Sequence, residues 1–91
     1  MTSFPSVPTD RRAASAAALS PLVRRVSENP EDVRCALRLA ETAILAGDSE
    51  TARAAFEEAY DLYLRSDFSL KAVAVAQMLV RLERFSAGAY L

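Results

Sequence analysis

The sequence predicts an all-α fold built from antiparallel helical hairpins. Of its 91 residues, 52% are hydrophobic, and only two are glycine and four are proline, which is typical of an ordered and mostly helical chain. Apolar residues recur at the three- and four-residue spacing of helices in successive stretches, with turn and capping residues between them. A chain of this length forms one domain at most.

Both ends of the chain are expected to lie outside that domain. Residues 1–8 contain two prolines and two serines without helical periodicity, so we expect a flexible N-terminal tail. The helical domain is predicted for residues 9–85, and residues 86–91 are predicted to form a short C-terminal tail.

The first helix is predicted to begin at a cap formed by Thr9 or Asp10. Ser20 followed by Pro21 indicates either that a second helix starts there or that one helix kinks, because proline lacks the backbone donor. The helix is expected to end before Pro30. Its apolar face contains Leu19, Leu22, Val23 and Val26.

The pattern of residues 31–64 predicts two helices joined by a turn at Gly47-Asp48. Glu31 and Asp32 are expected in the first turn of the earlier helix, Gly47 in its left-handed C-cap, and Asp48 or Ser49 at the cap of the next helix. The apolar face before the turn contains Val33, Ala36, Leu37, Leu39, Ala40, Ala43 and Ile44, and the one after it contains Ala52, Ala55, Phe56, Ala59, Tyr60, Leu62 and Tyr63.

The last helix, over residues 70–85, is apolar over more than half of its circumference, and Asp67 or Ser69 is expected to cap it. A terminal helix has one neighbour to pack against, so its apolar side chains cannot all face that neighbour. We therefore expect the C-terminal tail or a second molecule to cover part of it, and we predict assembly through this helix. The apolar residues concerned are Val73, Val75, Met78, Leu79, Val80 and Leu82.

The central hairpin resembles a tetratricopeptide repeat, a helix-turn-helix unit of 34 residues. The positions that match are Leu39, Ala40, Gly47, Asp48, Ala52, Phe56 and Ala59, whereas Ala36, Ala43 and Leu64 depart from the family's preferences. The resemblance is good over residues 33–59 and extends in degenerate form over 14–84. It implies a short array of four or five helices, and an ordinary four-helix bundle with the same hairpin is the competing interpretation.

The resemblance also implies where a partner binds, because such repeats hold a peptide or helix in the groove lined by their first helices. The carboxylate-clamp subtype is not expected, since Leu37 and Glu41 stand where it needs a basic residue and asparagine. The predicted partner-binding residues are Arg34, Arg38, Glu41 and Leu45 of the groove helix, with Val73, Val75, Met78, Leu79 and Leu82 of the last helix.

Catalytic chemistry has little support in the sequence. The chain has no histidine, Cys35 is its only cysteine, and two glycines cannot form a phosphate-binding loop. We therefore expect no enzymatic activity, no cofactor, no metal and no small-molecule substrate. A net charge of −1 argues against nucleic-acid binding.

The expected location is the cytoplasm of a bacterium. The lone cysteine suggests a reducing compartment, the N-terminus lacks the pattern of a signal peptide, and no apolar run is long enough to span a membrane. Frequent alanine and arginine, with Lys71 the single lysine, are typical of a GC-rich genome.

These observations predict a non-catalytic adaptor or scaffold module that binds a protein partner or a second copy of itself. Two alternatives stay open. One is a small secretion-type chaperone that shields an apolar helix of its client. The other is a regulatory subunit of a small-GTPase or signalling complex.

Overall fold

The structure is a computed structural model that describes the backbone of residues 7–88 and the side chains of residues 12–84. Within that part, four α-helices follow one another without any strand: α1 (Val7–Glu28), α2 (Val33–Ala46), α3 (Ser49–Arg65) and α4 (Ser69–Gly88). The predicted all-α class is therefore confirmed.

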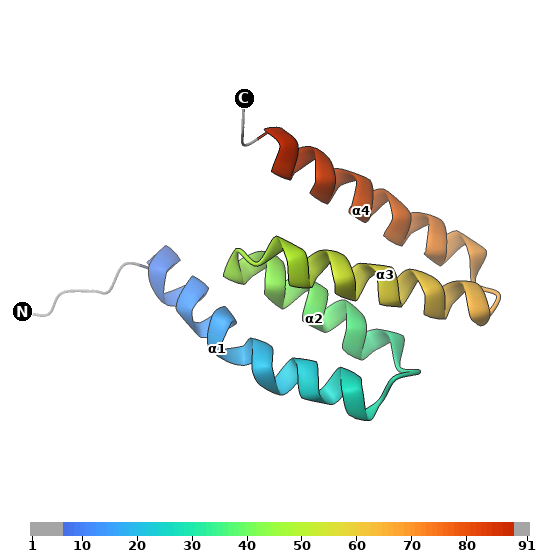
Figure 1. Ribbon diagram of the computed structural model, residues 1–91, viewed down its shortest axis with the longest axis horizontal. Helices are drawn as coiled ribbons and strands as arrows, with labels where there is room; N and C mark the ends of the chain where they lie inside the picture. The colour runs from blue at the N-terminus through green and yellow to red at the C-terminus, as the bar shows by residue number, and fades with distance from the viewer. Residues whose placement is uncertain (1–6, 89–91) are drawn as a thin grey trace, which may run out of the picture.

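Each helix runs antiparallel to the one before it, and the four lie in chain order across the molecule (Figure 1). Among the described residues, α1 packs on α2, α2 on α3 and α3 on α4, and the backbones of the other helix pairs do not approach each other closely. As a result α2 and α3 each have two neighbours, whereas α1 and α4 form the two edges.

Helix boundaries differ from the prediction at both ends of the domain. The backbone of Val7 and Pro8, expected in the tail, is already helical in α1, since proline is tolerated in the first turn. At the other end α4 continues to Gly88. The rest of the two predicted tails, residues 1–6 and 89–91, lies outside the described residues.

Pro21 lies inside one continuous helix, so the second start that Ser20-Pro21 allowed does not occur. The axis of α1 changes direction in its middle instead (Figure 1). Such a bend is expected where proline removes one backbone hydrogen bond of the helix.

Helix α2 begins two residues later than predicted. Glu31 and Asp32 precede the helix, and Asp32 is its N-cap in an extended conformation. Its Oδ1 accepts a hydrogen bond from the backbone N–H of Arg34 at 3.0 Å. The carboxylate thus satisfies an N–H that has no partner within the helix.

The turn between α2 and α3 favours glycine because of its backbone conformation. Gly47 has a φ of 79°, and the N–H of Asp48 donates to the carbonyl of Ala43 at 2.9 Å, which closes the end of α2. A Cβ at Gly47 would also displace the guanidinium of Arg12, the far end of a flexible and exposed side chain. That group donates from Nε to the carbonyl of Ala46 at 3.3 Å and so joins α1 to the C-terminal end of α2.

The core is small and consists mostly of alanine. Its buried residues are Ala36, Leu39, Ala40, Ala43, Ala52, Ala55, Phe56, Ala59, Leu62, Ala72 and Val75. Small side chains let the helix axes approach closely, while Phe56, the largest fully buried residue, fills the space between them.

The predicted apolar face of α2 is wrong at Ile44, whose side chain is exposed. It lies at the margin of the buried stripe whose centre is formed by Ala36, Ala40 and Ala43. Leu45, by contrast, is exposed as its place among polar residues indicated.

Candidate functional site

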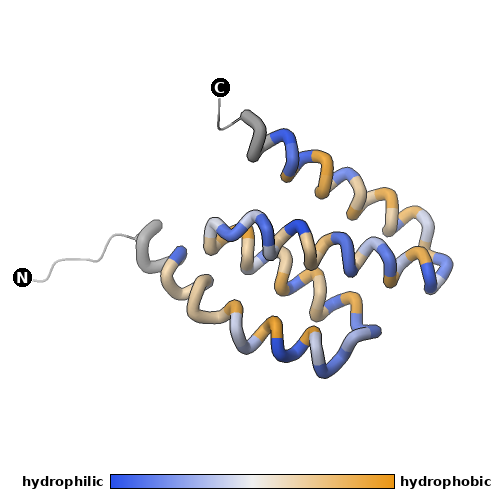
Figure 2. Tube along the Cα trace, viewed as in Figure 1, coloured by the Kyte–Doolittle hydropathy of each residue, from blue (hydrophilic) through white to orange (hydrophobic). Residues whose placement is uncertain are grey.

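Helix α4 buries only one of its sides. Ala72 and Val75 are buried, and Leu79 and Leu82 pack half-buried against the core. Four large apolar side chains elsewhere on the helix are exposed: Leu70 (85%), Met78 (40%), Val73 (53%) and Val80 (54%). Figure 2 shows hydrophobic positions along much of α4, beyond those that one buried side needs.

The predicted partner-binding residues of α4 differ in how much surface they expose. Val75 is only 5% exposed and belongs to the core cluster with Phe56, so it offers a partner little surface. Leu79 and Leu82 contact the same cluster with part of their surface. Of the predicted α4 residues, Val73 and Met78 remain fully outside the core.

A groove of about 470 Å³ runs between α2 and α4 above α3. Its lining residues are Leu37 and Glu41 of α2, Phe56 and Tyr63 of α3, and Lys71, Ala74, Val75, Gln77, Met78 and Arg81 of α4. The lining is apolar in its majority, and its charged members are two cations and one carboxylate. The groove is therefore suited to an apolar ligand that carries negative charge.

Aromatic rings hold Lys71 in place near the first turn of α4. Its Nζ lies 5.0 Å from the centroid of the Phe68 ring and 5.9 Å from that of Tyr63. The two rings meet edge to face, with centroids 6.3 Å apart and an interplanar angle of 80°. A cation placed over aromatic rings keeps its charge while its side chain loses freedom, so Lys71 is a positioned cation at the groove.

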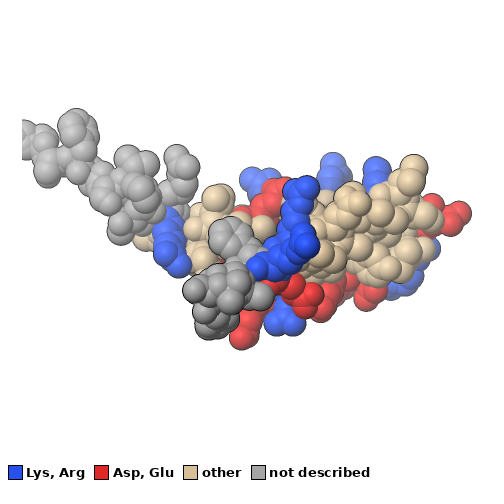
Figure 3. Space-filling view, turned by 90° about the horizontal axis from the view of Figure 1, so that it is seen from above, with Lys and Arg blue, Asp and Glu red and all other residues tan. Residues whose placement is uncertain are grey.

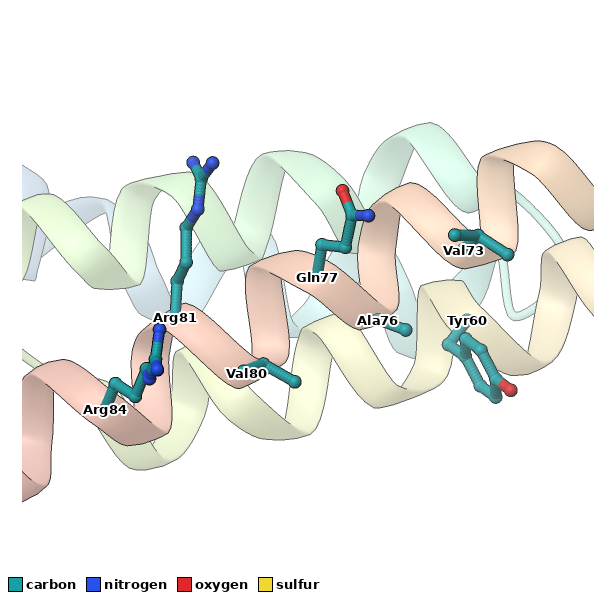
Figure 4. A pocket seen from close by; sticks show the side chains of 7 residues that line it. All are labelled: Tyr60, Val73, Ala76, Gln77, Val80, Arg81 and Arg84. Atoms are coloured by element: carbon teal, nitrogen blue, oxygen red, sulfur yellow. The ribbon is translucent and has the colours of Figure 1, made fainter.

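A second hollow of about 480 Å³ lies on the other side of α4 (Figure 4). It is lined by Tyr60 of α3 and by Val73, Ala76, Gln77, Val80, Arg81 and Arg84 of α4. Gln77 and Arg81 border both hollows, so they form the crest of α4 between them. In Figure 4 the side chains of Gln77 and Arg81 extend toward the top of the view, whereas the ring of Tyr60 points toward the bottom.

The surface that α4 presents at the edge of the molecule carries little charge over its N-terminal half. Figure 3, seen from above, shows a broad uncharged area there, with basic side chains gathered beside it. This edge and the groove together make α4 the helix with the most unpartnered apolar surface among those described.

Only one of the predicted residues of α2 lines the groove. Glu41 lines the groove, but Arg34, Arg38 and Leu45 are exposed outside it. Arg34 lies near the start of α2, where its Nε is 3.9 Å from Oδ1 of Asp32. The Arg34 side chain is 91% exposed and that of Asp32 is 42% exposed, so this ion pair contributes little to stability.

Several groove residues were not among the predicted partner-binding residues, notably Tyr63, Lys71 and Arg81. One signal for two of them is present in the sequence. Lys71, Met78 and Arg81 follow the spacing of one side of a helix, and Lys71 is the only lysine.

The described side chains, those of residues 12–84, contain no metal-holding group of three or more histidine, cysteine, aspartate or glutamate residues. No helix within the described backbone of residues 7–88 has the length and apolarity that crossing a membrane requires. Comparison with known proteins found no family model, no curated protein and no solved structure that matches the chain. The tetratricopeptide resemblance therefore stays a prediction from the residues.

Proposed function

We propose that this chain is a non-catalytic protein–protein interaction module that binds an apolar segment of a partner protein in the groove between α2 and α4. The observation that carries the proposal is the open apolar groove, in which Met78 stands exposed on one wall. Monomeric proteins rarely leave large contiguous apolar surface in water, and such surface commonly marks an interaction site.

The charges of the groove define the class of partner. Lys71 and Arg81 supply two positive charges on the α4 wall, against the single carboxylate of Glu41 on the α2 wall. The partner segment is therefore an amphipathic one whose apolar side chains cover Leu37 and Met78 and which carries at least one acidic residue. From Lys71 to Arg81 the α4 wall spans about 15 Å, the length of roughly three helical turns.

The proposal agrees with the resemblance of residues 33–59 to repeats that bind partner segments in a groove. Binding in this mode needs no chemical step, because apolar burial supplies affinity and the placed charges select among partners.

Site-specific photocrosslinking in the native cell tests this function. A photoreactive residue at position 78 is expected to capture a partner through a segment rich in apolar residues with aspartate or glutamate among them. The matched control is the same residue at position 23, since Val23 is exposed on α1 at the opposite edge. Identical captured proteins at both positions, or captured segments that are basic, would contradict the proposal.

A variant pair tests the same groove without the photoreactive group. Met78→Glu places a negative charge among the apolar lining and is expected to weaken binding of the captured segment at least tenfold. Val23→Glu adds the same charge elsewhere and is expected to leave binding unchanged. Fluorescence anisotropy with the captured segment as a synthetic peptide measures both.

A further inference from the structure

The outer side of α4 carries a stripe of five residues, of which only Gln77 also lines the groove. Leu70, Val73, Gln77, Val80 and Arg84 follow one another at intervals of three, four, three and four residues. All five are exposed and lie on the side of α4 opposite Ala72 and Val75. This alternating interval is the spacing by which two helices pack along a common seam.

We propose that a second copy of this chain covers the stripe, with the two α4 helices packed antiparallel about a two-fold axis. A two-fold contact uses the same surface on both copies and closes on itself. The second copy thus occupies one side of α4, and the groove on the other side stays open to the partner of the proposed function.

The stripe is self-complementary in the antiparallel direction. When the seam positions of one helix face those of a reversed copy, Leu70 meets the second copy's Val80, and Val73 meets the second copy's Gln77. Each pair occurs twice because of the symmetry. The most exposed large apolar side chain of the described residues, Leu70, is thereby removed from water.

Charges select the same direction. In this register Arg84 lies near the start of the second copy's α4, and the turn before that helix contains Asp67, an exposed carboxylate. Asp67 is held in a left-handed conformation with a φ of 66°, and hydrogen bonds on both sides of it fix the turn. A parallel pair would instead place Arg84 next to its own copy, which costs free energy through repulsion of like charges.

The opposite edge of the molecule offers no equivalent surface. Among the described residues of α1, Val23 is an exposed large apolar side chain, and it is followed by Arg24 and Arg25. Continued stacking of one chain's α4 on the next chain's α1 is therefore disfavoured, and a closed dimer is the expected assembly.

Sedimentation equilibrium of the full chain tests whether the dimer exists. At about 100 µM, a concentration chosen for the small area of a single-helix contact, we expect a reversible dimer. Leu70→Glu and Val80→Glu are each expected to raise its dissociation constant at least tenfold, and Val23→Glu to leave it unchanged. A monomer at that concentration, or a dimer that Val80→Glu does not weaken, would overturn the proposal.

Cysteine pairing tests the direction of the two helices. In a Cys35→Ser chain, which removes the native thiol, we mix a Leu70→Cys variant with a Val80→Cys variant under mild oxidation. Antiparallel packing brings these two positions within the short Cβ separation that a disulfide needs, so mixed dimers are expected in at least fivefold excess over either homodimer. Homodimers linked through position 70 in excess would show a parallel arrangement and refute the proposed register.

The two proposals fail separately. Met78→Glu changes the groove and is expected to abolish partner capture while the chain remains dimeric. Val80→Glu is expected to give a monomer that still binds the groove peptide. Loss of dimer and of peptide binding together in both variants, with unchanged circular dichroism, would show that a single surface of α4 serves both functions and would overturn their assignment to separate sides of the helix.

Discussion

Asp48 organises the turn in the middle of the chain through its two carboxylate oxygens. Oδ1 accepts a hydrogen bond from the N–H of Thr51 at 3.1 Å, and Oδ2 accepts one from the Thr51 hydroxyl at 2.6 Å. These bonds favour the charged form and lower the pKa of Asp48 from its usual value of 3.8, with the hydroxyl bond the largest cause. The stability that this cap provides must therefore depend on pH.

We expect Asp48→Ala to lower the free energy of unfolding by about 1 kcal/mol at neutral pH, the usual cost of losing an N-cap. Because the pKa of the folded state is the lower one, the contribution of the charge is fully present above the unfolded-state value of 3.8 and is lost as pH falls through the folded value. Urea unfolding of both proteins between about pH 6 and about pH 2 measures this loss.

Thr51→Val serves as the control for the cause. It removes the hydroxyl that donates to Oδ2, so the pKa of Asp48 is expected to move back toward 3.8, which NMR titration of the carboxyl detects. A difference between wild type and Asp48→Ala that stays constant across the whole pH range would contradict this account of the cap.

At the scale of the element, α4 carries similar apolar residues at its buried positions and at its exposed positions. Val75 and Val80 are the same residue type on one helix, yet Val75 is buried in the core and Val80 is exposed. Truncating a buried side chain loses transfer free energy and leaves a cavity, whereas truncating an exposed one loses neither.

We expect Val75→Ala to lower the free energy of unfolding by about 1–2.5 kcal/mol and Val80→Ala to change it by less than about 0.5 kcal/mol. Urea unfolding at low micromolar concentration measures both in the monomer. Equal effects of the two substitutions, or a larger effect at position 80, would mean that α4 packs on α3 with a different side.

The difference in composition between α4 and the two central helices explains which parts of the fold the sequence alone predicts. In α2 and α3, polar residues mark the outer face, so periodicity identifies the buried one, and it misplaces only Ile44 at the margin. In α4 nearly every side is apolar, so periodicity cannot decide which valine faces α3. The turn at Gly47 is predictable because glycine and a capping carboxylate are local signals.

The groove escapes prediction for a different reason. Its walls come from Glu41 and Met78, which are far apart in the sequence and share no helix. Which side of α4 turns toward α2 depends on how α3 and α4 pack, and no local pattern encodes that. Pro21 predicts either a bent helix or a second helix start, and the structure has the bent helix. Proline determines which backbone hydrogen bond is missing, but it does not determine whether the helix continues beyond that point.

At the scale of the whole molecule, the stability of each helix depends on how many other helices pack against it. Close backbone contacts among the described residues join only consecutive helices, so each helix depends on one or two neighbours, as in a linear array. Phe56 and the alanines around it lie in α2 and α3, which have neighbours on both sides. We therefore expect the edge helices to open more readily than the central pair.

Native-state hydrogen exchange is expected to follow this order. Amides of α2 and α3 should exchange most slowly, through global unfolding, and those of α1 before Pro21 most rapidly, since the alanine-rich stretch there is mostly exposed. Helix α4 should be intermediate in the Val80→Glu monomer and gain protection in the wild-type chain at concentrations where the dimer forms. If α1 and α3 exchanged at the same rate, the chain would unfold as one cooperative unit, and the division into a central pair and two dependent edges would be wrong.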